Sequence, residues 1–202
     1  VAIGNATARS ILFAPQDPKA YIYPGKAGYW QTGFPGGNHD YVVNGGKGGR
    51  DMDGRSLFFY LATVNTPAMV LELPGVGSQY AFSSRDSSGA YLDGSKTYKL
   101  NIPANPPAKR FWSFVVYDPQ TRSMLQSKEM PYPSKNNKRN PEMAKNADGS
   151  IDLYFGPEAP AGKEANWVKT VPGKGWFGIF RLYGPGQEWF DRSWKLGAIE
   201  KI

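Results

Sequence analysis

The hydrophobic period of this sequence changes near Pro67, and the change limits the folds open to the chain. Before Pro67, apolar residues within positions 57–61 lie near helical spacing. After it, Tyr98, Leu100 and Ile102 alternate with polar residues, as in a strand with one buried face. The change predicts helices near the start of the chain and β-structure through the remainder.

Strands separated by turn residues follow Pro67. The chain contains 24 Gly and 17 Pro in 202 residues, which suits short strands and tight turns better than a helical bundle. Turn signals stand at Asp93-Gly94, Asp118-Pro119 and Asp148-Gly149. The spacing predicts a mainly β fold, an antiparallel β-sandwich of jelly-roll-like form. The expected strands cover residues 98–102, 111–117, 151–155 and 176–183.

The first third of the chain is expected to contain short helices and a Gly-rich loop rather than strands. Short helices are expected over residues 5–13 and 55–63, with a Gly-rich loop or flexible arm over 24–49 between them. We therefore expect two units, a helical and Gly-rich connecting segment at 1–66 and a jelly-roll-like β-sandwich domain at 67–202. A start at Val1 rather than Met suggests a processed product or a fragment.

Short amphipathic helices are marginal on their own and are held by packing. The apolar faces of the two helices, which include Ile11, Leu12, Phe58 and Leu61, are therefore expected to contact a missing N-terminal domain or a neighbouring subunit. This expectation favours an oligomer or a nicked two-chain complex.

Composition excludes several kinds of catalytic site. The chain has no cysteine and one histidine, His39, in a Gly-rich stretch, so thiol chemistry is absent and a Ser-His-Asp triad has a single candidate base. With one His and no Cys a zinc site is not expected, and Gly45–Gly49 lacks the spacing and the Ser/Thr of a phosphate-binding loop. Asp51–Gly54 begins like a calcium loop without its bidentate Glu, although calcium held by scattered loop oxygens stays open. We expect no cofactor and no metal site.

Charge and hydropathy narrow the range of partners. The formal net charge is +7, but the most basic stretch, 135–145, is diluted by Asn, Pro and Glu142, so nucleic-acid binding is not expected. No run of 18 apolar residues occurs, so no membrane span is expected.

Six residues are candidates for a binding site. Arg181 lies inside an aromatic strand, where it either forms a structural ion pair, faces outward or binds a ligand. Tryptophans can pack in a core or stack against sugar rings. The predicted binding residues are Arg181, Trp167, Trp194, Asp118, Arg122 and Tyr183.

Asp118, Asp148 and Asn166 are expected to act mainly on backbone geometry, at turns and loop anchors. Asn166-Trp167 should hold a long loop in place.

Ordered motifs also carry a family resemblance. The stretches are Asp51–Arg55 with Leu57–Tyr60, Phe111–Ser113, Val116–Asp118, Thr121-Arg122, Asn146–Ser150, Asn166-Trp167, Arg181–Pro185 and Trp194. In this order the chain resembles the C-terminal part of bacterial proteins that combine domain of unknown function 1254 with domain of unknown function 1214. The resemblance implies a jelly-roll-like β domain that follows a second β domain and a helical connection, in proteins that are often exported to the periplasm or secreted. It implies no reaction and no catalytic residue.

Two functions from different classes remain open. The leading hypothesis is a non-catalytic binding or assembly module of an exported two-domain protein, with a glycan as one candidate ligand. The alternative is a hydrolase or lyase that acts on a polysaccharide or ester through carboxylate, Tyr and Arg groups. An enzyme requires a cleft in which at least two titratable side chains converge.

Overall fold

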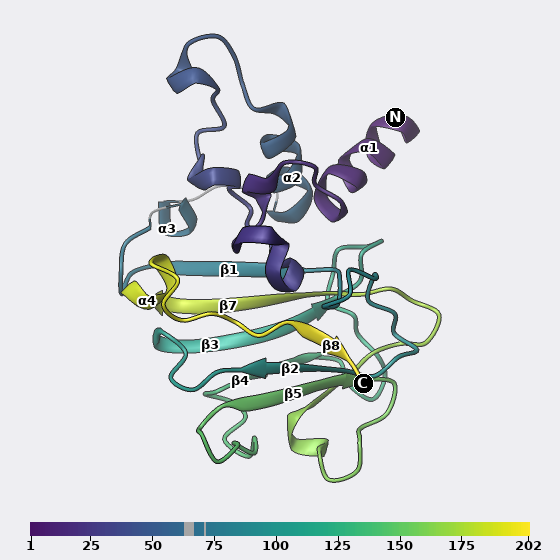
Figure 1. The fold of residues 1–202 in the computed structure, drawn as a ribbon. Coiled ribbons are helices and arrows are strands. Elements are labelled where there is room, and N and C mark those ends of the chain that lie inside the picture. Colours follow the sequence, from purple (N-terminus) through teal and green to yellow (C-terminus); the bar gives the residue numbers. More distant parts are fainter. Residues whose placement is uncertain (63–66, 71) are drawn as a thin grey trace.

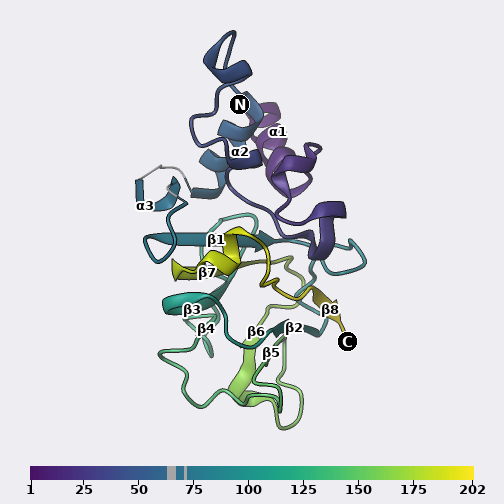
Figure 2. The same cartoon turned by 60° about the vertical axis from the view of Figure 1, so that its left-hand side comes forward.

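The computed structural model describes residues 1–62, 67–70 and 72–202. Two four-stranded sheets pack face to face, and the helices α1 and α2 lie on the β1 side of this sandwich (Figures 1 and 2). The mainly β fold class expected from the sequence is confirmed.

The first sheet is antiparallel and has the order β1-β7-β3-β4. Its strands are β1 (Ser78–Ser83), β7 (Phe177–Pro185), β3 (Ala108–Tyr117) and β4 (Ser134–Asn136). The apolar run predicted at 111–117 forms an interior strand, because β3 pairs with β7 on one side and β4 on the other.

The second sheet has the order β6-β5-β2-β8. Its strands are β6 (Trp167–Lys169), β5 (Ile151–Gly156), β2 (Tyr98–Ile102) and β8 (Ile199–Lys201). Strand β6 pairs with β5 in parallel, which is the one departure from antiparallel pairing among the described strands.

The alternation of side chains along the strands builds the core between the sheets. On β3, Trp112, Phe114 and Val116 face this core, and Phe114 meets Phe155 of the second sheet with ring centroids 4.8 Å apart. Leu153 is fully buried on the same inner face. The apolar residues that alternate in the sequence are therefore the ones buried on the inner faces of the sheets.

The intervening positions of the first sheet form a second, outer core with the helices. Helices α1 (Ala2–Phe13) and α2 (Met52–Ala62) pack against each other and against the outer face of β1 and β7. Phe82 of β1 and Ile179 of β7 are buried there. The α2 helix starts three residues before the predicted Arg55, and the predicted end at Thr63 lies outside the described residues.

This packing corrects, in part, the prediction that the apolar faces of the two helices contact another domain or subunit. Leu12 and Phe58 are buried within the chain, at 0% and 6% exposure, so they are not free to meet another domain. Ile11 and Leu61 are half-buried against the same outer core. The reason is that the outer face of β1 and β7 carries its own apolar side chains, and the helices cover them.

The Gly-rich loop is not a free arm. Trp30 is fully buried between the sheets, its indole Nε1 donates to the carbonyl oxygen of Gly197 at 2.8 Å, and Tyr23 belongs to the same core. The backbone of Gln31 exchanges two hydrogen bonds with Phe82 on the edge of β1. The loop is therefore part of the sandwich around Trp30 and Gln31, which corrects the prediction of a flexible arm at 24–49 for this part of the segment. The division at residue 66 stays a prediction, and residue 66 itself lies outside the described residues.

The other helices are short. They are α3 (Pro67–Val70), α4 (Gln187–Phe190) and the 3-10 segments Pro18–Ala20, Pro24–Tyr29, Pro35–Gly37, Asn44–Gly46 and Glu164–Asn166. Within the described ranges, no helix combines the length and apolar character that a membrane crossing needs.

Candidate binding site on the outer sheet face

Strand β7 presents four side chains to the outer face of the first sheet. Phe177 and Ile179 lie under the helices, and Arg181 and Tyr183 follow on the same side at the period of two. The register pairs Arg181 with Tyr80 on β1 and with Ser113 on β3. The helices cover one end of this face, so Arg181 stands where covered and open sheet meet.

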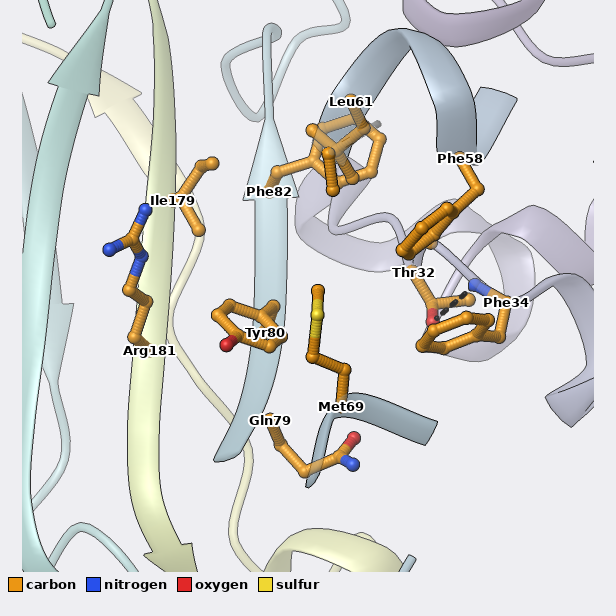
Figure 3. Close-up of a pocket in the computed structure, with 12 residues that line it drawn as sticks. Thr32, Phe34, Phe58, Leu61, Met69, Gln79, Tyr80, Phe82, Ile179 and Arg181 are labelled. Atoms are coloured by element: carbon orange, nitrogen blue, oxygen red, sulfur yellow. Dashed lines mark hydrogen bonds between the residues drawn. The ribbon is translucent and has the colours of Figure 1, made fainter. Parts of the chain in front are cut away.

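A pocket of about 300 Å³ lies at this junction, between the helical segment and strands β1 and β7 (Figure 3). Its apolar walls come from loop, helix and strand residues, and Met69 of α3 reaches between Tyr80 and Phe34 in Figure 3. The walls are Phe34, Phe58, Leu61, Met69, Phe82 and Ile179. Phe34 and Phe58 stack with ring centroids 4.9 Å apart. We call this site the Arg181 pocket.

The guanidinium of Arg181 is only partly satisfied. Its Nη2 donates a hydrogen bond to the hydroxyl of Tyr117, and its carbon lies 5.9 Å from the ring centre of Tyr80 and 5.8 Å from that of Tyr117. Its Nε is buried without a hydrogen-bond partner among the described residues, and no described carboxylate lies within ion-pair distance. A buried donor left unpaired costs about 1–3 kcal/mol, so this arrangement favours an acceptor from outside the chain.

Tyr117, which accepts a hydrogen bond from Arg181, is a hydrogen-bonding group rather than a base. Burial raises the pKa of Tyr117 more than the charge of Arg181 lowers it, so the phenol stays protonated at neutral pH. The hydroxyl of Tyr80 lies 2.6 Å from the hydroxyl of Ser78 on the same strand.

The described lining of the Arg181 pocket contains no Asp, Glu or His. Glu72 lines a neighbouring pocket together with Lys19 and Arg192, and this pocket shares Thr32, Phe34, Gln79 and Tyr80 with the Arg181 pocket. The geometry therefore offers a cation, neutral donors and apolar walls, without a pair of acid and base groups.

Two predicted binding residues, Asp118 and Arg122, make contacts within the chain that hold a turn in place. Asp118 is buried at the turn after β3, where it accepts hydrogen bonds from the N–H groups of Gln120 and Thr121 and from Lys174 Nζ at 2.8 Å. Arg122 donates to the carbonyl oxygen of Tyr60 at 3.0 Å and lies over the ring of Tyr60 at 4.2 Å. Asp118 therefore fixes the turn after β3, and Arg122 connects that turn to α2.

The two predicted tryptophans lie away from the Arg181 pocket. Trp194 is buried between the sheets, with its ring 5.9 Å from that of Phe180 and its Nε1 donating to the carbonyl oxygen of Ala104. Trp167 is half-buried at the edge of the second sheet, and its Nε1 donates to the carbonyl oxygen of Gly156 at 3.0 Å. Of the six predicted residues, only Arg181 and Tyr183 share one face of one strand.

The predicted loop anchors are confirmed in their geometry. The side chain of Asn166 makes three hydrogen bonds of 2.7–2.8 Å, two with the backbone of Ala144 and one with the carbonyl oxygen of Asp152. Asp148 accepts from the N–H of Ser150 at 2.9 Å, next to Gly149 with a φ of 83°. These bonds hold the loop before β5 against the sheet.

Tyr183 lies at a second hollow, an open groove of about 540 Å³ over β3 and β4. Its ring stacks on that of Phe111, the paired residue on β3, with centroids 4.1 Å apart and planes 16° apart. We call this hollow the β3–β4 groove.

Sequence reasoning missed most of the walls of the Arg181 pocket. The alternation in Ser78–Phe82 would have placed Tyr80 and Phe82 on one face, and it is the signal that was available. No local pattern predicts that Phe34 and Met69 line the pocket, because a loop and a four-residue helix bring them to the sheet.

Comparison with known proteins now assigns the chain to a family. Residues 77–187 match the family described as protein of unknown function (DUF1214), and the chain belongs to this family. The matched range includes Tyr80, Arg181 and Tyr183 and excludes the pocket walls from the loop and α2. No curated protein matches the chain.

Two solved structures resemble this chain. The VPA0106 protein from Vibrio parahaemolyticus is 24% identical, with a TM-score of 0.56 over 74% of this chain and 35% of that protein. An uncharacterised protein from Burkholderia cenocepacia is 18% identical, with a TM-score of 0.35 over 62% of this chain and 29% of that one. The first likeness supports the fold alone. The chain spans about a third of the length of these structures.

Proposed function

We propose that this chain is a non-catalytic binding module whose Arg181 pocket takes a small organic anion with an apolar body. The observation that carries the proposal is that Arg181 lines a pocket whose described lining has no acidic residue, while its buried Nε has no partner among the described residues. A carboxylate would pair with the guanidinium, and the apolar walls would receive the rest of the ligand.

The hydrolase or lyase alternative has less support. Such an enzyme needs two titratable groups that converge on a substrate. The described lining of the Arg181 pocket lacks a carboxylate, and the raised pKa of Tyr117 disfavours a phenolate base. Asp118 and Asp148 are engaged at separate turns.

The test compares carboxylates with their neutral amides. Hexanoate, octanoate and 4-phenylbutyrate should each bind the purified protein in calorimetric titrations, and the corresponding amides should bind at least about 10-fold more weakly, as expected when a charge-assisted hydrogen bond is lost. The variant Arg181→Gln should reduce carboxylate binding to the level of the amide.

The matched control is Arg55→Gln, which removes the same charge from an exposed position on α2 outside the pocket lining. It should bind carboxylates like the wild type. Equal affinity for amides and carboxylates, or full binding by Arg181→Gln, would refute the proposal.

We also propose that this module works beside a second domain of the kind called domain of unknown function 1254, in an exported protein. The support is the resemblance of the motifs and the share of the Vibrio protein, 35%, that this chain spans. Met52 and Phe59 of α2 are seven residues apart, on one side of the helix, and are 60% and 63% exposed. These side chains are the contact we assign to that domain.

The solution mass of the protein isolated from its organism tests this assembly, with mass spectrometry of every chain present. Additional polypeptide that protects Met52 and Phe59 from oxidation or labelling would support it. A dimer of this chain alone, with the same side chains protected, would replace the second domain by a neighbouring subunit. Cell fractionation tests export, because an exported protein appears outside the cytoplasm.

A glycan is a second ligand class that we propose for this chain. It is assigned to the β3–β4 groove, because the aromatic and polar side chains there lie on open sheet rather than under helices.

A further inference from the structure

The β3–β4 groove combines three kinds of side chain in one concave surface. Its floor holds Ser113 and Asn136, which are paired across β3 and β4. One wall is the stacked pair of Phe111 and Tyr183. Lys138 and Arg139 also line the groove, and both are exposed. These are an aromatic surface, neutral hydrogen-bonding groups and two cations.

The two cations are held by a rigid turn. The side-chain oxygen of Asn136 accepts hydrogen bonds from the N–H groups of Lys138 at 3.1 Å and Arg139 at 2.7 Å. The side chain of Asn140 in turn accepts from the N–H of Asn136 at 3.1 Å, and that of Asn137 accepts from the N–H of Trp112 at 2.9 Å. The backbone that carries the cations is therefore fixed to the end of β4 and to β3, which reduces the ordering needed on binding.

No described residue neutralises the positive charge of the groove. The described lining contains no Asp or Glu, and neither Lys138 nor Arg139 forms an ion pair with a described residue. Ser113 lines the groove with 8% of its surface exposed. The groove thus offers positive charge, the hydroxyl of Ser113 and the amide NH2 group of Asn136 to a ligand.

We infer that the β3–β4 groove binds an acidic oligosaccharide built of uronate units. The carboxylates of such a chain would meet Lys138 and Arg139, its hydroxyls would meet Ser113 and Asn136, and the C–H faces of its rings would lie against the aromatic wall. This inference specifies the sugar class for the glycan site proposed above and rests on that proposal. The groove shares no lining residue with the Arg181 pocket, so a failure of carboxylate binding in that pocket would not decide it.

Calorimetric titration of the purified protein with oligogalacturonate tests the inference. Neutral malto-oligosaccharide of equal length and a polyglutamate peptide of equal charge are the comparison ligands. Oligogalacturonate should bind at least about 10-fold more tightly than either, because it alone supplies both charges and sugar rings. The double variant Lys138→Ala/Arg139→Ala should lose about 10-fold or more and show a weaker dependence on salt concentration.

The control is the double variant Lys47→Ala/Arg50→Ala, which removes two exposed cations from a loop outside the groove lining. It should bind oligogalacturonate like the wild type. Phe111→Leu, checked for an unchanged melting temperature, should weaken both the neutral and the acidic sugar. Equal binding of polyglutamate, an equal loss in the control, or the absence of oligogalacturonate binding would overturn the inference.

Discussion

Two arginines of this chain contrast in their surroundings. Arg122 is an exposed residue that contacts Tyr60 through a hydrogen bond to the carbonyl oxygen and a position over the ring. Arg181 keeps a buried Nε without a partner among the described residues. A residue that serves stability should be satisfied, and a residue that serves binding is often left unsatisfied until the ligand arrives.

The first prediction follows from this contrast. Arg181→Met should leave the free energy of unfolding unchanged or raise it by roughly 1 kcal/mol, because removal of the desolvated Nε offsets the loss of the hydrogen bond to Tyr117. Arg122→Met should lower it by about 1 kcal/mol, because contacts with Tyr60 are lost. Denaturant unfolding of both variants measures the difference. A loss of more than about 2 kcal/mol in Arg181→Met would mark Arg181 as a structural residue.

Asp118 supports a prediction about pH. Burial by itself raises the pKa of this carboxyl, but the hydrogen bond from Lys174 and two bonds from backbone N–H groups outweigh burial and hold the pKa below its usual value. Because the folded-state pKa is depressed, the stabilisation is complete above the unfolded-state pKa of about 3.9 and is lost as the pH falls through the folded-state value.

Asp118→Asn should therefore be less stable than the wild type by roughly 1–2 kcal/mol at pH 7. The difference should shrink as the pH falls below about 4, where the wild-type carboxyl takes up its proton. Melting temperatures between pH 7 and pH 3 check this, with the exposed Glu129→Gln as the control. A difference that stays constant over this range would show that the charge of Asp118 has no part in stability.

At the scale of elements, the Gly-rich loop is the least expected part of the fold. Its residue Trp30 fills space between the sheets, with its ring 6.5 Å from Phe114 in an edge-to-face arrangement. Trp30→Ala should lower the free energy of unfolding by about 3–5 kcal/mol, because a large cavity forms in the core. Tyr132→Ala, at a side chain that is 72% exposed, should change it by less than about 0.5 kcal/mol. Equal effects in denaturant unfolding would contradict the observed burial of Trp30.

The elements that sequence reasoning found are those with several periods of pattern. Residues 98–102 form β2 as expected, and the runs at 111–117, 151–155 and 176–183 became β3, β5 and β7. Strands β4, β6 and β8 have three residues each, too few to show a period. They form because neighbouring strands supply hydrogen-bond partners, which a local pattern does not report.

The candidate site was predictable to a smaller extent. Arg181 was identified because a charge inside an aromatic strand is costly to bury unless it has a partner. The roles of Trp194 and Arg122 depend on partners at Ala104 and Tyr60, 90 and 62 residues away along the chain. Such contacts are set by tertiary packing, so local sequence cannot separate a core tryptophan from an exposed one.

At the scale of the molecule, the first third of the chain and the sandwich share their cores. Tyr23 and Trp30 belong to the core between the sheets, and Leu12 and Leu57 belong to the core on the outer face. Thermal unfolding should therefore be a single cooperative transition, with coincident curves from tryptophan fluorescence and far-ultraviolet circular dichroism. Two separate transitions would instead support independent units at 1–66 and 67–202.

The outer face of the first sheet is the functional face in this interpretation, and the Arg181 pocket is its best-defined site. A crystal structure of the protein soaked with 4-bromophenylacetate tests this directly, because the anomalous signal of bromine locates the ligand. We predict bromine between the apolar walls of the pocket, with the carboxylate within hydrogen-bond distance of Arg181 Nε. Bromine on another surface, or a pocket filled by a further segment of the protein, would contradict the proposed function.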